Sequence, residues 1–285
     1  MDDRQATLRI KFTGILGVFS HVDPKDPRVL IVAPNGIKNA NDGPVAAPDD
    51  VLKTEGAPKE REFASSLVYE AQADGDHIYE HLTELKRRGE IDGPLVISNS
   101  CGLRRREPPT RALEDDPLAQ VVLAAVDEGI PVVFGAGNHH HDELCRHDPT
   151  AAEPSTIWGV NSLDQVISVG AVDWNESNQD PTTRHRNSSR GPGQWTRTRP
   201  KPDCVAPTYG TVPWGCRTRE MEWWGTSGAC AQVAGLAALL LAADASLKPD
   251  EIADVIRDTA RPTGAPKECV GAGVIDCEAA VRRVV

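Results

Sequence analysis

Ser227 stands at the start of a long apolar segment, in the run GTSGACAQVAGLAALLLA over residues 225–242. This alanine- and leucine-rich composition predicts a helix that is buried on all sides, with Ser227 in its first turn. The first turn of a helix has free backbone N–H groups and the positive end of the helix dipole. A serine hydroxyl placed there is suited to attack a carbonyl carbon, because the same groups stabilise the oxyanion that forms. The simpler alternative is that Ser227 only caps the helix.

A second polar residue, Asn138, ends the apolar run PVVFGAGN over residues 131–138. This run is typical of a buried strand that enters a glycine-containing turn. The side-chain amide of Asn138 is suited to donate a hydrogen bond to the same oxyanion, and loss of one such donor typically slows a reaction about 10²–10³-fold. A nucleophile and an oxyanion donor together predict acyl-transfer chemistry.

Several segments in order resemble the subtilisin-like serine peptidases, known as subtilases or peptidase family S8. GTSGACAQVAG resembles the nucleophile segment of that family, and VVFGAGN resembles the strand that ends in its oxyanion-hole asparagine. VISVGAVD, SSRGP and KPDCVAPTYG follow in the family's order, and the resemblance covers roughly residues 28–285. It implies a serine protease, a hydrolase acting in proteolysis, with Ser227 as nucleophile and Asn138 in the oxyanion hole. The residues implied to flank an extended peptide substrate are Ser100, Cys101, Gly102, Gly135, Ala136 and Gly137.

The elements that position these residues alternate between β-branched runs and helical patterns. Strands are predicted over residues 28–36, 65–72, 95–100, 131–138 and 165–173, and helices over residues 76–90, 116–129, 225–242 and 249–260. Residues 174–202 are predicted to be a long polar loop. The alternation predicts an α/β fold, a three-layer, doubly wound, mostly parallel sheet of the subtilisin-like kind. We expect one domain over residues 1–285, with an N-terminal extension over 1–27 and a shortened loop over 38–60.

The aspartate and histidine of the family's catalytic triad have no match in this sequence. Pro34, in VLIVAPNGI, stands where the family has its aspartate, and the shortened loop over 38–60 contains no histidine. Without a base, a serine is a poor nucleophile near neutral pH. The sequence therefore predicts a degenerate catalytic triad with weak or unconventional proteolysis. The alternatives are an inactive pseudoenzyme that binds peptides or proteins, one half of a split peptidase completed by a partner chain, and a different acyl transfer at Ser227.

Other histidines are candidates for a substitute base. They are the cluster that follows Asn138, a loop residue and an N-terminal residue: His139, His140, His141, His185 and His21. The cluster is alternatively a metal site with Asp142, Glu143 or Cys145, or a solvated loop. His77 and His81 are four residues apart, a spacing that also suits a metal, but no third ligand is evident and helix surface is the preferred interpretation.

Composition limits the remaining possibilities. The 31 Lys and Arg against 42 Asp and Glu make a net charge of −11, which argues against a nucleic-acid partner. The acidic start MDDRQATLRIKF is unlike a signal peptide, and no apolar run reaches membrane-span length, so we expect a cytoplasmic protein with no membrane partner.

Ligands and partners are expected to be few. The expected partner is a peptide or protein substrate, and the tryptophans Trp214, Trp223 and Trp224 are candidates either for contact with it or for packing. No cofactor or metal ligand is assigned, although the family resemblance implies structural calcium, for which the stretch NANDG over 39–43 is a candidate. The seven cysteines form no CxxC pair, so we expect mostly reduced, buried thiols. Only an oxidising compartment would favour the pairs Cys204–Cys216 and Cys269–Cys277.

Overall fold

The computed structural model describes most of the chain from residue 75 onward and three short segments before it. The described residues are 8–13, 16–21, 30–32, 75–91, 93–100, 113–140, 155–173, 185, 187–208, 210–213, 220–223 and 225–285. The strand predicted over 65–72 and the loop predicted over 38–60 lie outside them.

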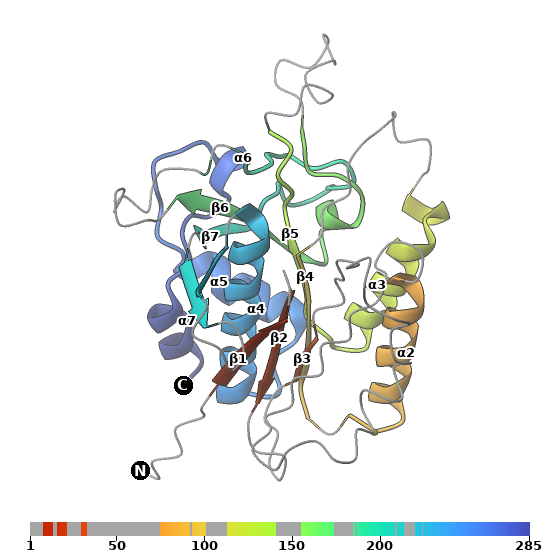
Figure 1. Cartoon of the computed structure of the whole chain (residues 1–285). Helices are drawn as coiled ribbons and strands as arrows, with labels where there is room; N and C mark the ends of the chain where they lie inside the picture. The colour runs from red at the N-terminus through yellow and green to blue at the C-terminus, as the bar shows by residue number, and fades with distance from the viewer. Residues whose placement is uncertain are drawn as a thin grey trace.

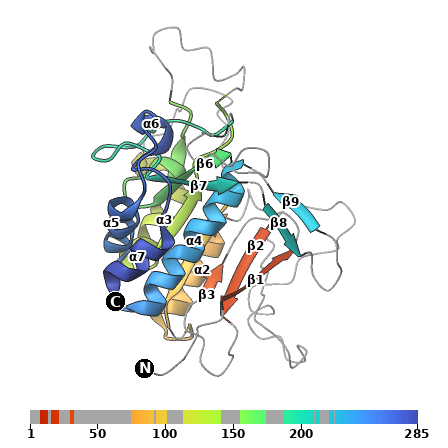
Figure 2. The ribbon, with the colours of Figure 1, turned by 90° about the vertical axis from the view of Figure 1, so that its left-hand side faces the viewer.

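A seven-stranded sheet forms the middle of the molecule, with the strands in sequence order (Figure 1). Its strands are β1 (Leu8–Thr13), β2 (Leu16–His21), β3 (Leu30–Val32), β4 (Leu95–Asn99), β5 (Val132–Gly135), β6 (Ile167–Asp173) and β7 (Cys204–Thr208). Strands β3 to β7 are parallel, and β1 and β2 pair antiparallel beside β3. A separate hairpin of β8 (Gly210–Pro213) and β9 (Glu220–Trp223) stands beside the sheet (Figure 2).

The antiparallel pair at the edge of the sheet corrects one expectation. Residues 8–21 lie within the segment interpreted as an N-terminal extension, but they form β1 and β2 and lengthen the sheet. The signal was present in LRIKFT, where apolar Leu8, Ile10 and Phe12 alternate with polar residues in the two-residue period of a strand.

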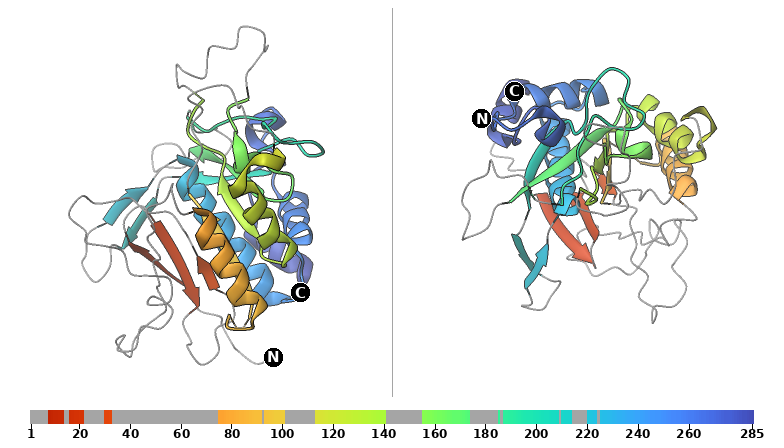
Figure 3. Two further views of the ribbon diagram at one scale, coloured as in Figure 1. Left: turned by 90° about the vertical axis from the view of Figure 1, so that its right-hand side faces the viewer. Right: turned by 90° about the horizontal axis from the view of Figure 1, so that it is seen from above.

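Helices cover both faces of the sheet and make the three layers that the sequence predicts. One face carries α2 (Gly75–Arg87) and α3 (Pro117–Asp127), which lie side by side (Figure 3). The other face carries α4 (Gly225–Ala243), α5 (Pro249–Thr259) and α7 (Cys277–Val284). Three short turns of helix, η1 (Leu113–Asp115), η3 (Gly159–Ser162) and α6 (Lys267–Val270), connect these elements. The α/β, three-layer architecture is therefore confirmed.

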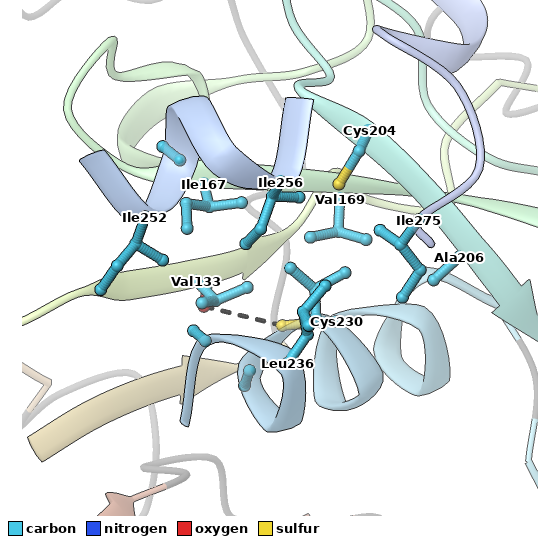
Figure 4. Packing of buried hydrophobic residues seen from close by; sticks show 14 of the residues in the cluster. Val133, Ile167, Val169, Cys204, Ala206, Cys230, Leu236, Ile252, Ile256 and Ile275 are labelled. Atoms are coloured by element: carbon cyan, nitrogen blue, oxygen red, sulfur yellow. Dashed lines mark hydrogen bonds between the residues drawn. The ribbon is translucent and has the colours of Figure 1, made fainter. Parts of the chain in front are cut away.

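Helix α4 is the central helix of one layer and carries Ser227 at its start. It has 19 residues and is buried over most of its length, with Cys230 and Leu236 packed among residues of β5, β6 and α5 (Figure 4). The expectation that no apolar run reaches membrane-span length is wrong for α4, which is long and apolar enough to cross a membrane by length and composition alone. However, 72% of its apolar window lies inside the domain. Buried core helices meet the same criterion, and the prediction of an all-round buried helix is confirmed.

The segment before β7 is a loop, as predicted, but part of it is buried. Lys201 is fully buried, and its Nζ donates to Asp203 Oδ2 at 2.6 Å and to the main-chain oxygen of Val166 at 2.6 Å. Arg257 on α5 donates to the other carboxylate oxygen of Asp203 at 2.9 Å. A buried charge is tolerated only when it is paired and hydrogen-bonded, and here one aspartate serves two cations. This cluster fixes the loop and α5 to the sheet.

Candidate functional site

Ser227 lies in the first turn of α4, as the sequence predicts, facing the C-terminal end of β4. Because α4 begins at Gly225, the N–H of Ser227 is one of the groups without an acceptor inside the helix. The side chain is half-buried, and its Oγ donates to the main-chain oxygen of Ser100 at 2.9 Å. In the described part of the chain, no histidine is hydrogen-bonded to Ser227.

Asn138 follows β5 and lies against the start of α4. Its Oδ1 accepts hydrogen bonds from the N–H of Thr226 at 3.0 Å and from the Thr226 hydroxyl at 3.2 Å. These contacts orient the amide, and among the described residues its Nδ2 donates to no protein group. The structure thus places a fixed amide donor beside the residue that precedes Ser227.

Two glycines allow this close approach. Gly225 has a φ of +74°, and a Cβ added there would lie 2.8 Å from Oδ1 of Asn138 and 3.0 Å from its Nδ2. A Cβ added to Gly135 would lie 3.1 Å from the main-chain oxygen of Thr226. A side chain at Gly225 would collide with the Asn138 amide, and one at Gly135 would press on the backbone of Thr226.

Thr226 joins the two segments and was not singled out from the sequence. Its hydroxyl accepts a hydrogen bond from the N–H of Gly137 at 3.2 Å and donates to Asn138. The main-chain oxygen of Gly225 accepts from the Thr208 hydroxyl at 2.9 Å, which ties the same turn to β7. Nothing in the local pattern indicates these roles, because every partner of the turn is distant in sequence.

Of the predicted peptide-binding residues, Ser100, Gly135, Ala136 and Gly137 lie near one another at the C-terminal ends of β4 and β5. Ser100 is half-buried, and its own Oγ donates to the main-chain oxygen of Ser227 at 3.1 Å. Cys101 and Gly102 lie outside the described residues.

The histidines that the structure describes near this site have other partners. The ring of His139 stacks on Trp158, with ring centroids 5.3 Å apart, and its backbone N–H donates to Ser189 Oγ. His140 donates its backbone N–H to the main-chain oxygen of Asn187. His185 is 2% exposed, and its Nδ1 accepts from the backbone N–H of Asn187 at 3.2 Å. None of the three is hydrogen-bonded to Ser227, and His141 lies outside the described residues.

The strand register excludes His21 as a base. Ser20 pairs with Leu30, the first residue of β3, and Leu30 pairs with Leu95, the first residue of β4. His21 therefore lies at the N-terminal end of the parallel strands, whereas Ser100 follows the C-terminal end of β4. Five residues of strand, at about 3.3 Å each, put roughly 16 Å between these two ends.

The described residues contain some of the side chains that the sequence singled out as possible metal ligands or disulfide partners. Within the described ranges, no three His, Cys, Asp or Glu side chains gather as metal ligands. Several other candidates lie outside what the structure describes. They are the possible metal ligands after His140, the stretch 39–43, Pro34, and the side chains of His77, Trp214, Trp223 and Trp224. Disulfides are formed by none of Cys204, Cys230, Cys269 and Cys277, so Cys269 and Cys277 form no bridge.

A cleft of about 610 Å³ lies on another part of the surface, between the 190–200 loop and α6. Its lining includes Arg190, Pro200 and Lys267 and none of the residues around Ser227. It is therefore separate from the candidate site.

Comparisons with known proteins identify a family with a similar sequence. The family model described as the subtilase family matches residues 61–273 of this chain. The chain is 30% identical over 184 residues to the serine protease AprX of Bacillus subtilis (strain 168), covering 59% of this chain and 39% of that protein. It is 30% identical over 194 residues to Mycosin-1 of Mycobacterium tuberculosis (strain ATCC 25618 / H37Rv), covering 60% of this chain and 40% of that protein. Each alignment therefore spans less than half of the relative's own length.

Among solved structures, the PatG macrocyclase in complex with peptide matches with a TM-score of 0.51 and 16% identity. The match covers 77% of this chain and 59% of that chain. At this level of identity the match concerns the fold alone, and it agrees with the three layers described above.

Proposed function

Because the chain belongs to the subtilase family, we propose that it binds an extended peptide and cleaves it only weakly. In this proposal Ser227 is the nucleophile, Asn138 is the oxyanion donor, and the aspartate and histidine of the triad are absent. The observation that carries it is the hydrogen bond from Ser227 Oγ to the main-chain oxygen of Ser100 at 2.9 Å. A carbonyl oxygen accepts a hydrogen bond but is too weakly basic to take the proton.

The chemistry follows from what remains at the site. Ser227 Oγ attacks the peptide carbonyl, and the oxyanion is held by Asn138 Nδ2 and the N–H of Ser227. The hydroxyl proton passes to solvent, because no described side chain accepts a hydrogen bond from Ser227 Oγ. The oxyanion then collapses, the carbonyl–nitrogen bond breaks, and the amine leaves with a proton from solvent. Water finally hydrolyses the acyl-serine ester and frees Ser227. Serine peptidases that lose a triad member keep about 10³–10⁴-fold catalysis over water from the oxyanion hole and binding, and we expect activity of this order.

The range matched by the family model supports the proposal that the aspartate and histidine of the triad are missing. The match begins at residue 61, after Pro34 and after the loop over 38–60 where the histidine motif is expected. The expected ligand class, a peptide or protein, follows from the name of AprX as a serine protease.

The test is the reaction of the purified chain with a rhodamine fluorophosphonate, followed by intact mass, with Ser227→Ala and Asn138→Ala as controls. Slow labelling that is lost in Ser227→Ala, falls in Asn138→Ala and rises about tenfold per pH unit supports the proposal, because hydroxide then removes the proton. Fast labelling that levels off near neutral pH means that a base is present and contradicts it. No labelling at any pH favours the inactive, peptide-binding alternative.

A further inference from the structure

We propose that Ser100 is a positioning residue for Ser227, holding both its backbone and its hydroxyl in the orientation required for attack. This inference rests on the proposed function, because it concerns the same nucleophile. It adds a role for the Ser100 side chain, beyond the expected contact between its backbone and a bound peptide.

The two serines are joined by reciprocal hydrogen bonds. Ser227 Oγ donates to the main-chain oxygen of Ser100 at 2.9 Å, and Ser100 Oγ donates to the main-chain oxygen of Ser227 at 3.1 Å. The two residues are 127 positions apart, so the pair links the end of β4 to the first turn of α4. Both side chains are half-buried and therefore stay accessible to a bound ligand.

The strand end that carries Ser100 is rigid. All five residues of β4 are buried, and the Asn99 side chain donates to the main-chain oxygen of Val133 on β5 at 3.1 Å. A serine side chain has three staggered rotamers, and a fixed acceptor selects one of them. With its proton directed at Ser100, the hydroxyl oxygen of Ser227 keeps its lone pairs for an electrophile. The Ser100 hydroxyl holds the backbone of the same turn, and its loss should lower the population of this arrangement by about threefold to tenfold.

Ser98 provides a matched control on the same strand. Its Oγ lies 3.6 Å from Cys230 Sγ, one helical turn beyond Ser227, and Ser98 is 1% exposed. Ser98→Ala therefore also removes one polar contact between β4 and α4, but it leaves the nucleophile's own residue untouched. A purely structural role for Ser100 predicts the same behaviour for both alanine variants.

The test uses Ser227→Cys in the full chain, because a thiolate attacks an ester without a base from the protein. The reagent is p-nitrophenyl acetate: the new sulfur–carbon bond forms, the ester carbon–oxygen bond breaks, p-nitrophenolate leaves with the electron pair, and the thiol proton passes to solvent. Acetylation is measured by mass spectrometry on the peptide that contains position 227, since other thiols are present. Ser100→Ala, Ser100→Thr and Ser98→Ala are each added to this background.

The expected result is a maximal acetylation rate threefold to tenfold lower with Ser100→Ala, recovery with Ser100→Thr, and no change with Ser98→Ala. The ester concentration for half-maximal rate should stay constant, and Tm should fall by a similar amount in both alanine variants. Equal rates in the two alanine variants would overturn the proposal.

The same variants with Ser227 intact, labelled by fluorophosphonate, separate this inference from the proposed function. If Ser227 is inert while the introduced thiol depends on Ser100, the proposed cleavage fails and the positioning role stands. If Ser227 is labelled equally with and without the Ser100 hydroxyl, the positioning role fails and the proposed function stands.

Discussion

Gly225→Ala should disable the oxyanion donor without touching it directly. The added Cβ would lie 2.8 Å from Asn138 Oδ1, closer than real Cβ contacts come, and 3.0 Å from its Nδ2. The short Asn138 side chain must therefore rotate away, which breaks its hydrogen bond with the N–H of Thr226 at 3.0 Å. Displacement of the donor should reduce fluorophosphonate labelling of Ser227 about 10²-fold.

Stability should fall for two separable reasons. A non-glycine residue at the φ of +74° costs about 1–2 kcal/mol. The lost hydrogen bond to Asn138 adds about 0.5–1.5 kcal/mol. Urea denaturation should therefore show a loss of about 1.5–3.5 kcal/mol in the free energy of unfolding.

Gly264→Ala separates the two effects. Gly264 has a φ of +77°, and an added Cβ there would meet nothing within 4 Å. This variant should lose about 1–2 kcal/mol of stability and keep full labelling of Ser227. In an Asn138→Ala background, Gly225→Ala should cause no further loss of labelling, because the side chain that it displaces is already gone. A labelling loss shared by Gly264→Ala, or a full further loss in the double variant, would refute the reasoning.

Three further outcomes are expected elsewhere in the fold. Asp203→Asn leaves the buried Lys201 without its charge partner at 2.6 Å, and urea denaturation should show a loss of about 3–5 kcal/mol. Burial alone raises the pKa of Asp164, but hydrogen bonds from the 197–199 segment outweigh it and hold that pKa below the usual 3.8. The stabilisation by Asp164 is therefore present above pH 3.8 and is lost as the pH falls through the lower folded-state pKa. As the pH is lowered through this range, the midpoint of urea denaturation should fall more steeply in the wild type than in Asp164→Asn. In the native protein, a maleimide should modify the exposed Cys277 well before Cys204, whose thiol pKa is raised by burial, and peptide mass spectrometry would show the order.

Much of the fold was predictable because it depends on local periodicity. The all-round apolar run after Gly225 predicts the buried helix α4, and the β-branched runs before Ser100 and Asn138 predict β4 and β5. The polar loop before β7 shows the limit of such patterns. The segment was predicted to be a long polar loop, but Lys201 within it is buried, because Asp203 and the main-chain oxygen of Val166 accept hydrogen bonds from its Nζ.

The sequence by itself determined the family, the parallel α/β layers, and the identity of a serine and an asparagine suited to acyl chemistry. Only the tertiary structure decided what these two side chains contact. The hydroxyl of Ser227 meets a backbone carbonyl 127 residues away, and Asn138 is oriented by Thr226, 88 residues further along the chain. Local patterns record how one segment folds, whereas these bonds depend on how separate strands and a helix end at one edge of the sheet. The same register carries His21 to the opposite end of the strands and removes it from the site.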